Sequence, residues 1–127
     1  KEAVEIADVL KLPHGRDPEA EFEALATAIR GKLDIDCVVV HPRKAAAAAT
    51  KTATARFNGP FTEKPLISTG AGDHFNAGFA VGRVLGFTLE ESVCAGAATS
   101  GYYVRTARSP SAADLAEFIA KLPATGG

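Results

Sequence analysis

Hydrophobic residues recur at the three- and four-residue spacing of a helix in five stretches of the chain. The second stretch has the clearest pattern, with an apolar stripe from Phe22 to Ile29. It opens with Asp17 and Pro18, an acid suited to capping a helix followed by a proline at the first helical position. The spacing predicts helices over residues 2–10, 18 to about 31, 71–85, 89–104 and 111–122.

Short apolar runs between the helices predict strands. Residues 37–40 are apolar and β-branched, which is typical of a strand buried on both faces in a parallel sheet. The alanine run that follows favours a helix by propensity, but it is too short to form one independently. We therefore predict a hairpin of strands 45–50 and 53–57, and a further short strand at 65–67. This order of elements indicates an α/β fold.

Composition and charge exclude several classes of protein. The chain is 46% hydrophobic and 23% charged, so it has enough apolar material for a core. Its 127 residues correspond to one domain or to part of one. Its net charge is −1 and no basic stripe is present, so we expect no nucleic-acid partner. No apolar run approaches 18 residues and no signal peptide is seen, so we expect no membrane contact and a cytoplasmic location.

The segment from Ser68 to Phe79 carries the chemistry. Its glycines lead into a helix, whose first backbone N–H groups have no internal partner and point outward. The amides of Gly70, Ala71, Gly72 and Asp73 therefore form a candidate anion hole. A carboxylate at Asp73 beside a bound phosphoryl group would accept a proton from an attacking hydroxyl. The segment is thus a candidate phosphoryl-transfer site.

The string Thr69-Gly70-Ala71-Gly72-Asp73-x-Phe75-x-Ala77-Gly78-Phe79 resembles the second signature of the PfkB carbohydrate kinases, which include ribokinase, fructokinase and adenosine kinase. The resemblance implies a three-layer α-β-α ribokinase-like fold, of which residues 1–127 form the C-terminal, nucleotide-binding part. We expect an N-terminal substrate and lid half upstream of Lys1, without which the chain should be inactive. The implied reaction transfers the γ-phosphoryl group of ATP to a sugar hydroxyl, with Asp73 as catalytic base and Mg²⁺ on the phosphates.

The resemblance also suggests further ligand contacts, each with a plainer alternative. Glu2 corresponds to the acid of the family's Asn-x-x-Glu motif, which holds Mg²⁺ through water, or it is a solvated helix residue. Arg43 and Lys44 lie where the family has a Gly-x-x-Gly loop, and they contact phosphate or are simply solvated. Thr69 belongs to the nucleotide loop.

The predicted helix 89–104 flanks the expected adenine position. Its small residues around Gly96 and Thr99 leave room for a purine, or they serve close helix packing. We interpret His74 as a structural or solvent-facing residue, because its side chain should point away from that of Asp73, and we interpret Tyr102 and Tyr103 as packing residues. The resemblance also leaves open whether backbone carbonyl groups near residues 105–109 bind a monovalent cation.

One competing hypothesis remains at this stage. A non-catalytic nucleotide-binding or assembly module derived from such a kinase would explain the altered loop after residue 40, although it has no use for Asp73. The sequence leaves a homodimer open, and it does not identify the sugar or its reacting hydroxyl.

Overall fold

The computed structural model describes residues 1–15 and 17–122 of the chain. Five helices and three strands occur within them, in the order α1 (Glu2–Val9), α2 (Pro18–Leu33), β1 (Cys37–Val40), β2 (Ala45–Thr50), β3 (Thr54–Asn58), α3 (Ala71–Val84), α4 (Leu89–Thr106) and α5 (Ala112–Ala120). The five predicted helices and the predicted hairpin are therefore present.

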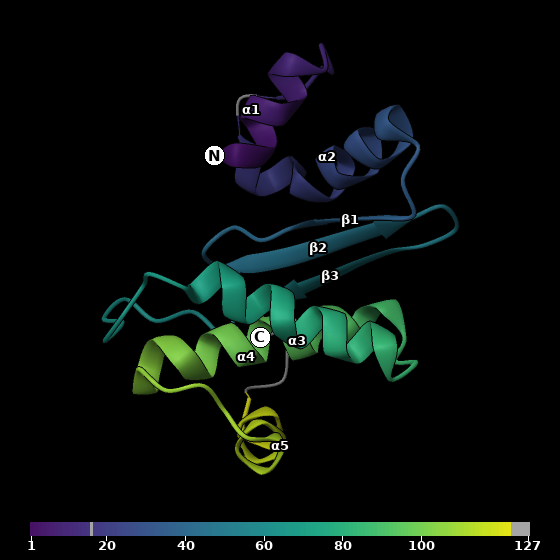
Figure 1. The fold of residues 1–127 in the computed structure, drawn as a ribbon. Coiled ribbons are helices and arrows are strands. Elements are labelled where there is room, and N and C mark those ends of the chain that lie inside the picture. The colour runs from purple at the N-terminus through teal and green to yellow at the C-terminus, as the bar shows by residue number, and fades with distance from the viewer. Residues whose placement is uncertain (16, 123–127) are drawn as a thin grey trace.

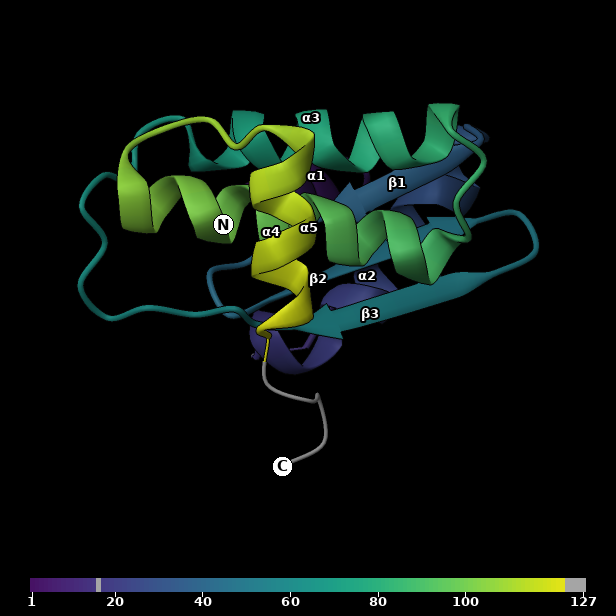
Figure 2. The same ribbon diagram turned by 90° about the horizontal axis from the view of Figure 1, so that it is seen from below.

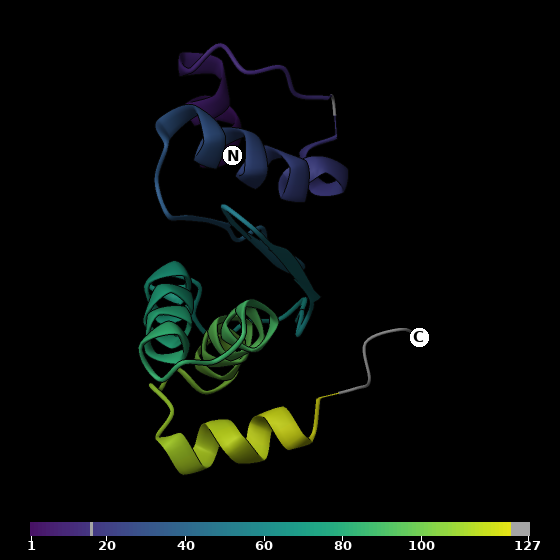
Figure 3. The ribbon, with the colours of Figure 1, turned by 90° about the vertical axis from the view of Figure 1, so that its right-hand side faces the viewer.

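The elements form three layers (Figure 1). α1 and α2 lie on one face of the sheet, while α3 and α4 cover the other face (Figure 3). α5 packs on the outer side of α4 and runs across it (Figure 2). This is the predicted α-β-α arrangement, with α5 added outside the third layer.

The sheet corrects one expectation about its topology. Its strand order is β1-β2-β3 and both pairs are antiparallel, whereas residues 37–40 were expected to form part of a parallel sheet. The physical reason is the short link 41–44, since a parallel connection needs a crossover of a dozen or more residues. β1 is an edge strand here and its residues are only half-buried.

The central strand β2 is built almost entirely of alanine. Each residue of the run Ala45–Ala49 is buried, because β2 pairs with a strand on both sides and is covered by helices on both faces. Ala46 and Ala48 face the cluster that contains Phe75, whereas Ala45 and Ala47 pack with Phe22 under α2. Small side chains let both helical layers approach the sheet, and this tertiary environment overrides the helical preference of alanine.

Two details differ from the sequence expectations. The predicted strand at 65–67 is an irregular segment, in which the Leu66 amide donates to the Val104 carbonyl at 2.7 Å. Pro65 has no N–H group to contribute to a ladder. In α5, the apolar stripe of Leu115, Phe118, Ile119 and Leu122 is only half-buried, because that helix packs mainly on α4.

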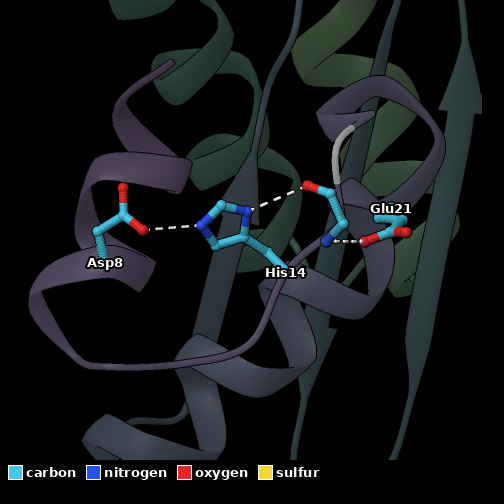
Figure 4. A network of polar contacts seen from close by, with 4 residues as sticks. Asp8, His14 and Glu21 are labelled. Atoms are coloured by element: carbon cyan, nitrogen blue, oxygen red, sulfur yellow. Dashed lines mark hydrogen bonds and ion pairs between the residues drawn. The ribbon is translucent and has the colours of Figure 1, made fainter.

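A polar network closes the link between α1 and α2 (Figure 4). His14 Nε2 lies 2.8 Å from Asp8 Oδ1, and His14 Nδ1 lies 3.1 Å from the Gly15 carbonyl oxygen. The Gly15 amide in turn donates to Glu21 Oε2 at 2.6 Å. Because both ring nitrogens face acceptors, this geometry favours the doubly protonated imidazolium form of His14.

Candidate active site

The glycine turn lies at the N-terminus of α3. Gly70 has φ +88°, a left-handed conformation that favours glycine, and a Cβ there would come 3.3 Å from the Tyr103 hydroxyl. Within the described residues, the amides of Gly70, Gly72 and Asp73 have no acceptor. The Ala71 amide, in contrast, donates to the Ser68 carbonyl at 3.1 Å. Of the four donors expected to point outward, three are thus without an acceptor among the described residues.

The Asp73 side chain is exposed and accepts no hydrogen bond from the described part of the chain. It does not fold back onto the neighbouring amides, so those donors stay open to a ligand. Asp73 lines an apolar groove of about 640 Å³ together with residues of α3 and α5, among them Ala77 and Leu115. Ala71 and Gly72 line a different cavity, so the turn borders two open spaces.

This second cavity, of about 310 Å³, brings together segments that are far apart in the sequence. The loop after β1 contributes His41 and Arg43, the loop after β3 contributes Phe61, and α4 contributes Ser100 and Gly101. Arg43 and Phe61 also contact each other, with the guanidinium carbon 5.9 Å from the ring centroid. The cavity thus has an apolar wall, a cationic rim and glycine amides at one side.

Lys44 and Thr69, two other predicted nucleotide contacts, lie near this cavity but do not line it. The Lys44 ammonium lies 5.3 Å from the Phe61 ring centroid, on the same ring as Arg43. The Thr69 carbonyl accepts a hydrogen bond from the Tyr103 hydroxyl at 3.0 Å.

Gly96 and Thr99 lie between α3 and α4 instead of at the cavity. A Cβ on Gly96 would come 2.9 Å from the ring of Phe75, and the Thr99 hydroxyl donates to the Ala95 carbonyl at 2.7 Å. Both residues take part in helix packing, and Thr99 also lines the groove that contains Asp73, while neither lines the smaller cavity. Ala97, Ser100 and Gly101 line the cavity in their place.

Glu2 lies in the first turn of α1 and is exposed. It lines a groove of about 670 Å³ that also reaches Arg43. The described residues contain no group of three or more potential metal-ligating side chains. A single exposed carboxylate is chemically suited to hold Mg²⁺ through water, since Mg²⁺ keeps most of its waters and substrate ligands.

Among the side chains that line the smaller cavity, His41 has a pKa that is strongly lowered by burial. Its ring stacks on Phe75 with the centroids 4.1 Å apart, and burial lowers the pKa of His41 to about 4. His41 is therefore neutral at pH 7. The positive charge among the lining residues comes from Arg43.

The turn itself is held from behind by side chains. His74 Nδ1 lies 2.8 Å from the Gly70 carbonyl oxygen, and His74 Nε2 lies 2.8 Å from Ser109 Oγ. The His74 and Tyr103 rings stack with centroids 3.6 Å apart. This confirms the structural interpretation of His74 and Tyr103. Because the Thr69 and Gly70 carbonyl groups already accept hydrogen bonds, the geometry adds nothing in favour of a monovalent cation at this turn.

Sequence reasoning missed the role of Arg105. Its guanidinium donates to the carbonyl groups of Gly101 and Phe61, both at 2.8 Å, and to that of Pro60 at 3.5 Å. Arg105 thereby ties the loop after β3 to α4, and this loop forms one wall of the smaller cavity. An arginine near the end of a small-residue helix was the available signal, but its partners in the loop, Phe61 and Pro60, are 44 and 45 residues away.

No helix in the described ranges is both long and apolar enough to cross a membrane.

Comparison with known proteins yields a consistent set of relatives. A family model for prokaryotic ketohexokinase matches residues 2–122. A ketohexokinase from Haloferax volcanii is 33% identical over 104 residues, which cover 82% of this chain and 26% of the relative. The chain thus spans about a quarter of that protein.

Solved structures give the same fold. A nucleoside kinase of the ribokinase family from Methanocaldococcus jannaschii matches with a TM-score of 0.65 and 26% identity, over 82% of this chain and 38% of that one. Phosphofructokinase-2 from Escherichia coli matches with a TM-score of 0.72 and 20% identity, over 93% and 38%. Ribokinase from Thermotoga maritima matches with a TM-score of 0.70 and 23% identity, over 93% and 39%. The chain therefore has an α/β ribokinase-like fold and belongs to the prokaryotic ketohexokinase family of PfkB-type carbohydrate kinases.

Proposed function

We propose that this chain is the C-terminal, nucleotide-binding part of a sugar kinase that transfers the γ-phosphoryl group of ATP to a hydroxyl of a ketohexose. The observation that carries the proposal is the turn at the start of α3, where open amide donors stand beside an exposed carboxylate that does not occupy them. The ketohexose assignment rests on the family model and on the relative from Haloferax volcanii.

In the proposed reaction, the amides of Gly70, Gly72 and Asp73 donate hydrogen bonds to the phosphoryl oxygens. Donors that are fixed before the reaction stabilise the charge that develops during transfer without further rearrangement. The Asp73 carboxylate accepts the proton of the attacking hydroxyl. Bound Mg²⁺ supplies neutralisation of phosphate charge, with Glu2 as the residue that would hold it through water.

The two open spaces on either side of the turn support a division of roles. The nucleotide would lie in the smaller cavity, with its base against the surfaces of Ala97, Ser100 and Gly101 and its phosphates near Arg43. The acceptor hydroxyl would approach from the side of Asp73. In such an arrangement, nucleotide and acceptor would meet at the anion-binding amides, where in-line transfer requires the attacking and leaving oxygens to lie on opposite sides of the phosphorus.

The test uses the full-length protein with ATP and Mg²⁺, and measures ADP release with a panel of ketohexoses and aldoses. We expect turnover with a ketohexose, and we expect Asp73→Asn to lower kcat by about 10²- to 10⁴-fold with ATP binding largely retained. Glu90→Gln is the matched control, because Glu90 is another exposed acid in the first turn of a helix.

A non-catalytic nucleotide-binding module is the alternative outcome. It predicts that the wild-type protein binds ATP in a calorimetric titration but releases no ADP with any sugar, and that Asp73→Asn changes neither result. Near-normal turnover of Asp73→Asn would instead remove the base assignment.

A further inference from the structure

The carbonyl groups of two consecutive peptides in the turn accept hydrogen bonds from side chains. The Tyr103 hydroxyl donates to the Thr69 carbonyl at 3.0 Å, and His74 Nδ1 donates to the Gly70 carbonyl at 2.8 Å. The Gly70 carbonyl also accepts the His74 backbone amide at 3.0 Å, so that His74 holds this one oxygen twice.

A hydrogen bond that fixes a carbonyl group also fixes the direction of the N–H group in the same peptide. In a planar trans peptide, the C=O of one residue and the N–H of the following residue point in opposite directions. The hydrogen bond from Tyr103 to the Thr69 carbonyl therefore aims the Gly70 N–H away from Tyr103 and out of the turn. This N–H is one of the three donors that have no acceptor in the described residues.

The side chains that hydrogen-bond to the turn also contact one another. The imidazole of His74 lies nearly parallel to the Tyr103 ring, with an interplanar angle of 11°. Because the Gly70 carbonyl can only accept, His74 Nδ1 carries a hydrogen, and the Ser109 hydroxyl, 2.8 Å from Nε2, holds the other end of the ring. Ser109 lies in the segment between α4 and α5, so three elements meet at this ring.

We propose that His74, Tyr103 and Ser109 are positioning residues, a brace that holds the turn so that the Gly70 N–H points outward to bind a phosphoryl group. Tyr103 lines neither cavity, whereas His74 and Ser109 also line the groove that contains Asp73. The brace acts through the peptide planes, and its catalytic consequence rests on the proposed function. Loss of the brace lets the Thr69–Gly70 peptide rotate, which removes the Gly70 donor from the transition state more than it weakens binding of the nucleotide.

The first experiment measures the brace without reference to activity. Hydrogen–deuterium exchange at the Ala71 and His74 amides reports on the turn, because these amides donate to Ser68 and Gly70 within it. In the full-length protein, we expect Tyr103→Phe to raise exchange at these two amides about 2- to 10-fold, since it keeps the ring and removes the hydroxyl. The matched control is Tyr102→Phe, because Tyr102 packs edge-on against Phe118 and away from the turn. Unchanged exchange in Tyr103→Phe and His74→Phe would overturn the brace.

The second experiment compares substitutions of the histidine. His74→Phe keeps a flat ring over Tyr103 but donates no hydrogen bond, whereas His74→Asn places an amide donor close to the position of Nδ1. We expect His74→Phe to lower kcat about 10- to 100-fold with less than about a 3-fold change in KM for ATP, and His74→Asn to restore most of the rate. Ser109→Ala should have a smaller effect in the same direction.

The exchange and kinetic experiments distinguish failure of the brace from failure of the proposed function. A residue with only a packing role would lower the thermal stability of His74→Phe and His74→Asn alike and leave kcat unchanged, which would overturn the catalytic part of the inference. If the wild-type protein transfers no phosphate, the proposed function fails, while the exchange measurement still decides whether the brace holds the turn.

Discussion

Gly78 of α3 lies so close to Thr99 of α4 that a Cβ added to the glycine would come 2.3 Å from the threonine hydroxyl. The same Cβ would lie 2.7 Å from the Ala95 carbonyl oxygen, which belongs to the backbone and cannot rotate away. The two helices of the third layer therefore approach each other at a residue without a side chain, and α3 carries the candidate site at its N-terminus.

We predict that Gly78→Ala lowers the free energy of unfolding by about 1–3 kcal/mol, because α3 must shift away from α4. Gly31→Ala is the control, since a Cβ at Gly31 in α2 meets nothing within 4 Å. It should stabilise the protein by roughly 0.5–1 kcal/mol, as expected for replacing glycine inside a helix. Urea unfolding of both variants checks this pair, and equal effects would contradict the packing argument.

Arg105→Lys should loosen the wall of the smaller cavity. An ammonium group cannot reproduce the forked contact of the guanidinium with the Gly101 and Phe61 carbonyl groups. We expect a loss of about 1–3 kcal/mol in unfolding free energy and a weaker affinity for ATP, measured by denaturation and by calorimetry. Arg108→Lys serves as control, because the Arg108 side chain is exposed and outside the cavity. ATP affinity that is unchanged in Arg105→Lys would separate this loop from nucleotide binding.

The pair Asp8–His14 should stabilise the fold below neutral pH. The hydrogen bond that His14 donates to Asp8, followed by the one to the Gly15 carbonyl, raises the pKa of His14 above its usual value of 6.5. The contribution is therefore fully present below pH 6.5 and is lost as pH rises through the folded-state pKa. Unfolding free energies of wild type and Asp8→Asn, measured across this range, should converge at high pH. Parallel curves would show that the pair contributes nothing.

His41 should give the opposite pH dependence. Burial lowers the pKa of His41 from 6.5 to about 4, so the unfolded chain binds more protons between these values. Stability is therefore retained above pH 6.5 and falls as the pH drops toward about 4, by an amount on the order of 2–3 kcal/mol. His41→Gln removes the titrating ring and should flatten this part of the stability profile. A wild-type profile that is already flat there would place the His41 ring in contact with solvent.

Much of the local structure could be predicted from the sequence, because its signals are local. The stripe from Phe22 to Ile29, the capping box of Thr88 and Glu91, and the glycine turn before Asp73 each depend on residues a few positions apart. The hairpin in the alanine run was also predicted, because Pro42 and the short length exclude a helix there. The resemblance to the PfkB signature likewise lies within one continuous segment.

Only the tertiary structure decided how these segments meet. It showed that β1 pairs antiparallel with β2, that residues 65–67 form no strand, and that the Ala71 amide is occupied within the turn. It showed that Gly96 and Thr99 lie at the contact between α3 and α4, outside the smaller cavity. The physical reason is distance along the chain: the contacts that shape the site join residues about 35 to 45 positions apart, such as His74 with Ser109 and Arg105 with Phe61, and no local pattern encodes them.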